Sequence, residues 1–203
     1  RVTYLTELEG PTLRAAMKAV KPTGIVGIPA LWDVLQRRVE AQVKDRGEAA
    51  ALLFKLGTKL NRQLRAKGLN AGPLLFSEVH ESLGGSVRYL VSGGAALNSA
   101  SLELFEGLGF ELLEGYGLTE AAPVLAVRRP KSKPSRGRAQ SSVGPALPGV
   151  ELKIHNPNEE GVGEVIARGD NVMLGYLDQE EATQEVLRDG WLHTGDLGSI
   201  NKR

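Results

Sequence analysis

The chain has 203 residues, of which 25 are Lys or Arg and 24 are Asp or Glu, and its formal net charge is +1. This near-neutral balance gives no field that favours nucleic acid, and the absence of cysteine excludes disulfides and cysteine-ligated metals. No apolar run approaches the ~20 residues that cross a bilayer, so we expect a cytoplasmic globular protein without a nucleic-acid partner.

The first part of the chain alternates helix-like and strand-like patterns. Residues 12–20 are a short helix candidate, and the apolar run 24–28, bounded by Pro22 and Pro29, predicts a buried strand. In the next two segments apolar residues recur at spacings of three to four, which predicts two amphipathic helices. Their apolar faces are Leu31, Leu35, Val39 and Val43, then Leu53, Leu56, Leu60 and Leu64.

Further along, helix and strand patterns continue to alternate. Helices are predicted over residues 76–83 and 99–107, and strands over 87–91 and 110–113. Strands that alternate with helices indicate parallel β-α-β units. The predicted fold class is therefore α/β, with a parallel-type sheet flanked by helices, over residues 1–127.

The composition changes between residues 128 and 138, where six basic residues and two prolines occur without an acid. We interpret residues 128–140 as a solvated basic loop. The alternative is contact with lipid headgroups or phosphate, which would place the protein peripherally at the inner face of a membrane.

Beyond the loop the pattern is typical of a small β-rich, barrel-like subdomain over residues 141–203. Apolar residues alternate over 150–154, a turn follows at 156–158, and residues 163–167 return as a strand. Asp178 and Glu181 fit a capping box that opens a short helix, and Asp189 precedes a glycine turn.

Three short segments combine glycine with polar or aromatic side chains. They are SGGAA at residues 92–96, EGYGLTE at 114–120 and DGWLHTGD at 189–196. The first two follow predicted strands, and the carboxyl edge of a parallel sheet is where α/β proteins bind ligands. Each segment alone is also compatible with an ordinary glycine turn.

The side chains in these segments suit a nucleotide. Tyr116, between two glycines, can present its ring to a purine, and Thr119 offers a hydroxyl to a phosphate oxygen. Glu120 offers a carboxylate to Mg²⁺, which takes one or two carboxylates together with phosphates and water. Asp196 can accept hydrogen bonds from ribose hydroxyls. His193 has no visible partner, and we interpret it as a structural side chain.

The three segments occur in the order and spacing of the adenylate-forming superfamily, which the chain resembles over nearly its whole length. Within it, WLHTGD at 191–196, MLGY at 173–176 and SVGPALPG at 142–149 resemble the long-chain fatty acyl-CoA synthetase branch. The resemblance implies ATP, Mg²⁺ and coenzyme A as reactants or cofactors and a fatty acid as substrate.

The resemblance also implies a role for each matching residue. Thr119 and Glu120 would be catalytic, Thr119 at the α-phosphate and Glu120 as a Mg²⁺ ligand, while Asp196 would bind the ribose. Four further residues would line the adenine: Gly94, Glu114, Gly115 and Tyr116. Gly117 would border the acyl tunnel.

Two features of the family are not found in this sequence. They are the lysine-containing phosphate loop upstream of these segments and the mobile C-terminal domain with its catalytic lysine. We therefore interpret the chain as an internal piece of the large N-terminal domain, inactive alone. The alternatives are a fatty acyl-AMP ligase, an aryl-CoA ligase, or a non-catalytic nucleotide-binding scaffold.

Overall fold

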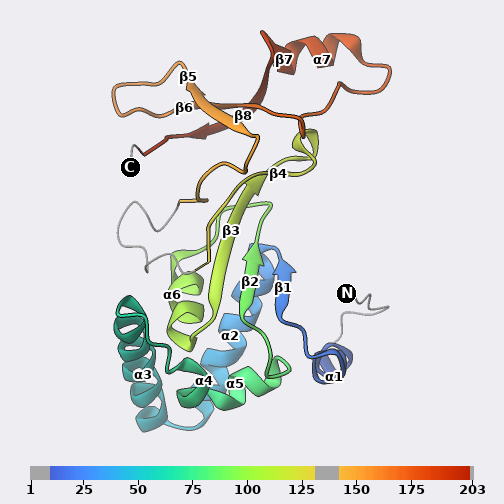
Figure 1. Ribbon diagram of the computed structural model, residues 1–203. Coiled ribbons are helices and arrows are strands. Elements are labelled where there is room, and N and C mark those ends of the chain that lie inside the picture. The colour runs from blue at the N-terminus through green and yellow to red at the C-terminus, as the bar shows by residue number, and fades with distance from the viewer. Residues whose placement is uncertain (1–9, 131–141, 202–203) are drawn as a thin grey trace. The chain divides into compact units, whose positions relative to one another are not determined.

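The computed structural model describes residues 10–130 and 142–201, and its contacts divide the chain into two units (Figure 1). The first unit runs to Glu114, and the second comprises Gly115–Arg128 and the chain from Val143 onward. Residues 131–141, most of the predicted basic loop, lie outside the described part. No helix in the described ranges has both the length and the apolar character to cross a membrane.

The first unit is built on three parallel strands, as the sequence predicts. Strand β2 (Tyr89–Ser92) pairs on one side with β1 (Gly24–Gly27) and on the other with β3 (Glu111–Gly117). Ser92, the last residue of β2, pairs with Glu114 of β3. Glu114 is also the last residue of β3 that belongs to the first unit. The arrows of β1, β2 and β3 run in one direction in Figure 1, which confirms a parallel-containing α/β sheet.

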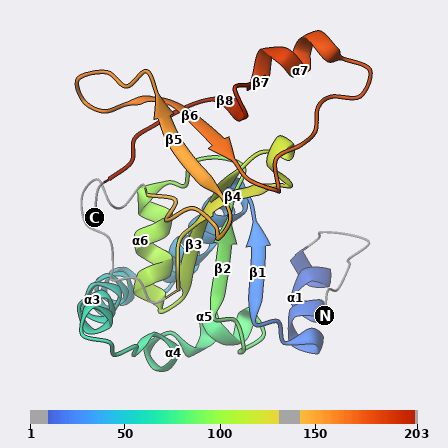
Figure 2. The same ribbon diagram turned by 45° about the horizontal axis from the view of Figure 1, so that its top comes forward.

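Helices enclose the core of the first unit. Trp32 of α2 and Phe105 of α6 are buried and meet edge to face, with ring centroids 5.9 Å apart. Buried Leu90 and Leu112 of the sheet belong to the same cluster. The helices are α1 (Gly10–Val20), α2 (Pro29–Asp45), α3 (Glu48–Ala66), α4 (Gly72–Leu75), α5 (Ser77–Ser82) and α6 (Ser99–Leu108), and Figure 2 shows them around the strands.

Two expectations about burial are wrong in this unit. Strand β1 was expected to be buried, but its residues are alternately exposed and half-buried, and Val26 is 80% exposed because its face of the strand is not covered by the described residues. Helix α3 forms as expected, yet its leucine row at positions 53, 56 and 60 is exposed. The side of α3 that packs instead carries buried Asn61, whose amide donates to the carbonyl of Gly107 at 2.9 Å.

The second unit contains an antiparallel sheet of four strands in the order β5-β6-β8-β7. The sheet is open in the described part of the chain, so closure into a barrel is not seen there. Helix α7 begins after Gln179, which makes no side-chain cap, so the predicted capping box is wrong. The elements are β4 (Val124–Val127), β5 (Glu151–His155), β6 (Gly163–Arg168), α7 (Glu180–Val186), β7 (Leu187–Arg188) and β8 (Trp191–Gly198).

The end of β3 and the turn after it also belong to the second unit. Gly115 to Gly117 were expected to follow a strand, but they continue β3 and pair antiparallel with β4. A single 3₁₀ turn, η1 (Thr119–Ala121), then leads into β4. Buried Ala121, Leu125, Ala167 and Leu192 form the core that fixes this turn against the sheet.

Candidate functional site

Tyr116 and Asp196, which are 80 residues apart in the sequence, meet in the second unit. The Tyr116 hydroxyl donates to Oδ2 of Asp196 at 2.8 Å. Burial is the largest cause that raises the pKa of Tyr116 to about 12, and the adjacent carboxylate of Asp196 raises it further. The purine-stacking and ribose-binding candidates therefore lie within hydrogen-bonding distance of each other.

Asp196 lies in β8, and the part of this strand around Gly195, which has a φ of +73°, is held by a carboxylate on the neighbouring strand. Oε1 of Glu164 accepts the backbone N–H of Gly195 at 3.0 Å, and its Oε2 lies 2.8 Å from Nδ1 of His193. The hydrogen bond to His193 lowers the pKa of Glu164. The Thr194 hydroxyl donates to the carbonyl of Val165 at 2.7 Å, which fixes the same part of β8 on β6.

Glu164 was not singled out in the sequence, and His193 appeared there without a partner. Their pairing depends on the register of β6 against β8, which shifts between Glu164 and Ile166. A single sequence carries no signal for this irregularity. The interpretation of His193 as a structural side chain agrees with its contact.

Glu120 lies in the 3₁₀ turn after β3 and is held from a second segment. Its Oε1 accepts a hydrogen bond of 2.7 Å from the Tyr176 hydroxyl, and its backbone carbonyl accepts one of 2.7 Å from the N–H of Met173. Thr119, beside it, is exposed and thus accessible to a ligand. Tyr176 was part of the quoted MLGY segment but had no predicted role.

Gly117 is explained by the backbone around it. A Cβ at this position would lie 1.8 Å from the carbonyl oxygen of Pro123 and 2.8 Å from Cα of Val124. Any side chain would therefore force β4 away from β3. The resemblance also places Gly117 beside an acyl tunnel, and this placement stays a prediction.

Gly94 and Glu114 belong to the first unit and lie at the carboxyl edge of its parallel strands. Gly94 has a φ of +85°, and a Cβ there would meet only Cγ2 of Ile28 at an ordinary 4.0 Å, so its conformation rather than crowding favours glycine. Glu114 is buried, with only 7% of the residue exposed, so its contact with the edge of a base stays a prediction. Gly94 and Tyr116 belong to different units, and a base shared between them stays a prediction.

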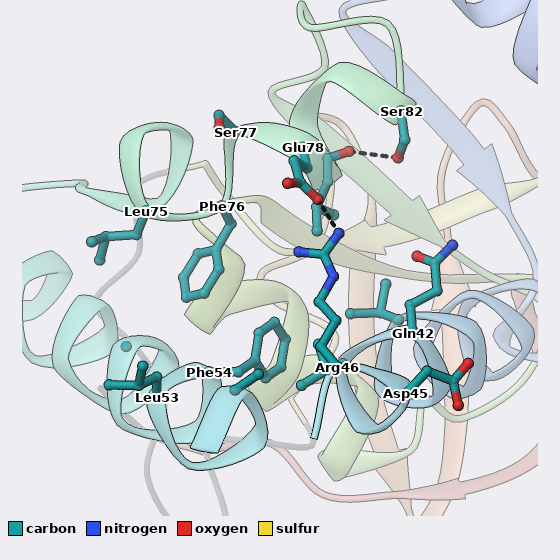
Figure 3. A pocket seen from close by; sticks show the side chains of 15 residues that line it. Gln42, Asp45, Arg46, Leu53, Phe54, Leu75, Phe76, Ser77, Glu78 and Ser82 are labelled. Atoms are coloured by element: carbon teal, nitrogen blue, oxygen red, sulfur yellow. Dashed lines mark hydrogen bonds and ion pairs between the residues drawn. The ribbon is translucent and has the colours of Figure 1, made fainter. Parts of the chain in front are cut away.

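A cavity of about 840 Å³ in the first unit is lined by none of the predicted site residues. It lies among α2, α3 and α5, at the amino ends of the strands. Figure 3 shows Phe54 and Phe76 beside each other in its wall, where they meet edge to face with ring centroids 5.3 Å apart, and the exposed ion pair of Arg46 with Glu78 at 2.6 Å. Its location separates it from the carboxyl edge where Gly94 lies.

The metal expectation rests on Glu120 alone. In the described ranges no group of three or more His, Asp or Glu side chains gathers that could hold a metal ion. A single carboxylate fits Mg²⁺ only where phosphate oxygens and water supply the other ligands. Oε2 of Glu120 has no hydrogen-bond partner within the described residues, so one oxygen of the carboxylate fits such a role.

We expect the replacement Asp196→Asn to lower the pKa of Tyr116 from about 12, because it removes the negative charge that opposes phenolate formation. Burial remains, so the pKa should stay above its ordinary value. The raised pKa stabilises the fold fully below about pH 10, and this contribution is lost as the pH rises towards 12.

An absorbance titration of the full-length protein at alkaline pH measures this shift. The sequence has four tyrosines, so a Tyr116→Phe control identifies the transition that belongs to Tyr116. An unchanged midpoint in the Asp196→Asn variant would contradict the hydrogen bond.

Comparison with known proteins places these residues in a family. Residues 2–177 match the family model described as AMP-binding enzyme. The chain is 34% identical over 197 residues to long chain acyl-CoA synthetase 3 of Arabidopsis thaliana, covering 89% of this chain and 29% of that protein. It is also 34% identical over 203 residues to long-chain-fatty-acid–CoA ligase ACSBG2 of Rattus norvegicus, covering 94% and 30%.

The fold of this chain also resembles that of a solved structure. The N-terminal domain of FACL13 from Mycobacterium tuberculosis superposes with a TM-score of 0.66 at 19% identity, over 97% of this chain and 41% of that one. The chain spans less than a third of the length of the two curated relatives. Because the family model covers most of the sequence, this chain belongs to the AMP-binding enzyme family.

Proposed function

We propose that this chain is part of a long-chain fatty acid–CoA ligase. In the first step the carboxylate oxygen of the fatty acid attacks the α-phosphorus of ATP, and the bond to pyrophosphate breaks. In the second step the thiol sulfur of coenzyme A attacks the acyl carbon, AMP leaves, and the thiol proton is released. The family match and the names of the relatives support this reaction class.

The single observation that carries the proposal is the meeting of Tyr116 with Asp196. In the proposed site the Tyr116 ring stacks on adenine, and the remaining carboxylate oxygen of Asp196 accepts from the ribose. The Thr119 hydroxyl donates to an α-phosphate oxygen. These groups act by positioning ATP so that its α-phosphorus meets the carboxylate.

The proposal gives Glu120 the role of metal ligand. When bound, Mg²⁺ would offset the charge of the phosphates, as is usual in phosphoryl-transfer sites. The proposal further includes specificity for long-chain fatty acids and a peripheral location at a membrane. It also includes completion of the small sheet of the second unit as a barrel by strands from the rest of the protein.

The test is pyrophosphate release from ATP by the full-length protein with palmitate, followed by analysis of the thioester. We expect turnover of ~1 per second or more for the full-length protein. The chain of 203 residues should stay at background, because it offers base, ribose and metal contacts without a phosphate loop. Circular dichroism of the isolated chain is the control for its folding.

Other outcomes distinguish the alternatives. Accumulation of acyl-adenylate without thioester would favour a fatty acyl-AMP ligase. Faster turnover with benzoate than with palmitate would favour an aryl-CoA ligase. Absence of pyrophosphate release with every acid would favour a scaffold, and the ligase proposal would then be withdrawn.

A further inference from the structure

The Tyr176 side chain contacts the carboxylate of Glu120 although the two residues are 56 positions apart. The phenol donates to Oε1 at 2.7 Å, and both residues belong to the second unit. A tyrosine hydroxyl can donate one hydrogen bond, so in this contact the phenol supplies the proton and the carboxylate accepts it.

The backbone of Tyr176 is itself fixed in place. Its N–H donates to the Thr183 hydroxyl at 2.9 Å, and that hydroxyl donates in turn to the carbonyl of Gln179 at 2.8 Å. A Cβ on Gly175 would lie 2.8 Å from Cγ2 of Thr183, so the chain passes close to α7 immediately before Tyr176. Helix α7 therefore sets where the phenol can reach.

Two further contacts tie the turn of Glu120 to the segment before Tyr176. The N–H of Met173 donates to the Glu120 carbonyl at 2.7 Å. The Asn171 amide donates to the carbonyls of Ala121 at 2.8 Å and Val124 at 3.0 Å. These contacts fix the backbones that carry Glu120 and Tyr176 relative to each other, so the Tyr176 hydroxyl stays within reach of the Glu120 carboxylate.

We propose that Tyr176 is a positioning residue for adenylation: its hydroxyl holds Oε1 of Glu120 and leaves Oε2 for the metal ion that accompanies ATP. The inference rests on the proposed function. A neutral donor suits this task because it orients the carboxylate without cancelling its charge. Groups that orient a ligating carboxylate typically contribute 10–100-fold to metal affinity or activity.

The test compares the two half-reactions in the full-length protein and its Tyr176→Phe variant. Acyl-adenylate formation from ATP, Mg²⁺ and palmitate should fall about tenfold in the variant. Thioester formation from chemically supplied acyl-adenylate and coenzyme A needs neither ATP nor the metal, so its rate should be unchanged. Tyr89→Phe is the matched control, since it removes a phenol hydroxyl from β2 in the first unit, and both rates should stay at the wild-type value.

A double variant shows whether Tyr176 acts through Glu120. If it does, Glu120→Ala combined with Tyr176→Phe should be no slower in adenylation than Glu120→Ala alone. Additive losses, or equal losses in both half-reactions, would overturn the inference.

The wild-type rate separates this inference from the function on which it rests. An active wild type with an equally active Tyr176→Phe variant overturns the positioning role alone. A wild type that forms no acyl-adenylate overturns the proposed function and the positioning role together.

Discussion

Replacing Glu120 with alanine is expected to slow acyl-adenylate formation about 10²–10³-fold in the full-length protein, the usual cost of losing an electrostatic contact in a transition state. The change removes the carboxylate that faces the proposed metal and leaves phosphate charge uncompensated. Folding should suffer little, because the side chain contributes one hydrogen bond, to Tyr176, worth about 1 kcal/mol. The rate of acyl-adenylate formation and the melting temperature, measured on the same preparation, separate the two effects.

Glu159→Ala is the matched control for this variant. Glu159 is an exposed glutamate in the turn between β5 and β6, so its loss should change stability by less than about 0.5 kcal/mol and leave the rate intact. If Glu120→Ala behaved in the same way, Glu120 would be a structural residue, and the Mg²⁺ assignment would be withdrawn.

Gly117→Ala is expected to destabilise the second unit by about 3 kcal/mol, at the upper end of the usual cost of overpacking. The added methyl group would meet the backbone carbonyl of Pro123 rather than a side chain that can rotate away. Strand β4 would have to separate from β3 next to the turn of Glu120. A lower melting temperature, with adenylation lost in the same variant, is the expected result.

Gly24→Ala provides the control, because Gly24 is also a strand glycine with an ordinary φ. A Cβ there would lie 3.7 Å from its nearest neighbour, the Tyr89 carbonyl oxygen, which is a normal contact. The control should melt close to the wild-type temperature. Equal melting temperatures for the two variants would show that β3 and β4 are not as close as described.

The sequence predicts the elements of the first unit well and their burial poorly. The run over residues 24–28 forms a strand and the leucine row of α3 forms a helix, because local apolar spacing determines both. Whether those side chains are covered depends on which element lies beside them. Val26 at the sheet edge and Leu53 on α3 have no such cover within the described residues and are exposed.

The residues of the candidate site also fall into those that the sequence predicts and those that it does not. Tyr116, Glu120 and Asp196 could be chosen from short motifs, since their residue types and order are local information. The residues that hold them in place, Tyr176 and Glu164, could not be chosen from the sequence. The Tyr176 contact with Glu120 depends on the path of the chain before α7. The Glu164 contact with Gly195 depends on the register of β6 against β8 and its irregularity. Such contacts join residues far apart in the sequence, and no periodicity in a single sequence encodes them.

Tyr116 and Asp196 are 80 positions apart, so during synthesis Tyr116 is made well before its partner. At a synthesis rate of ~5–20 residues per second, Tyr116 is made roughly 4–16 s before Asp196. For the first part of that interval the turn after β3 lacks the Asn171 amide, which donates to the carbonyls of Ala121 and Val124 and lies 50 positions beyond Ala121. Apolar Leu125, which is buried in the finished fold, stays without its Leu192 neighbour for most of the same interval. During synthesis this apolar segment is therefore exposed before the residues that cover it exist, and exposed apolar chain of this kind is prone to aggregation.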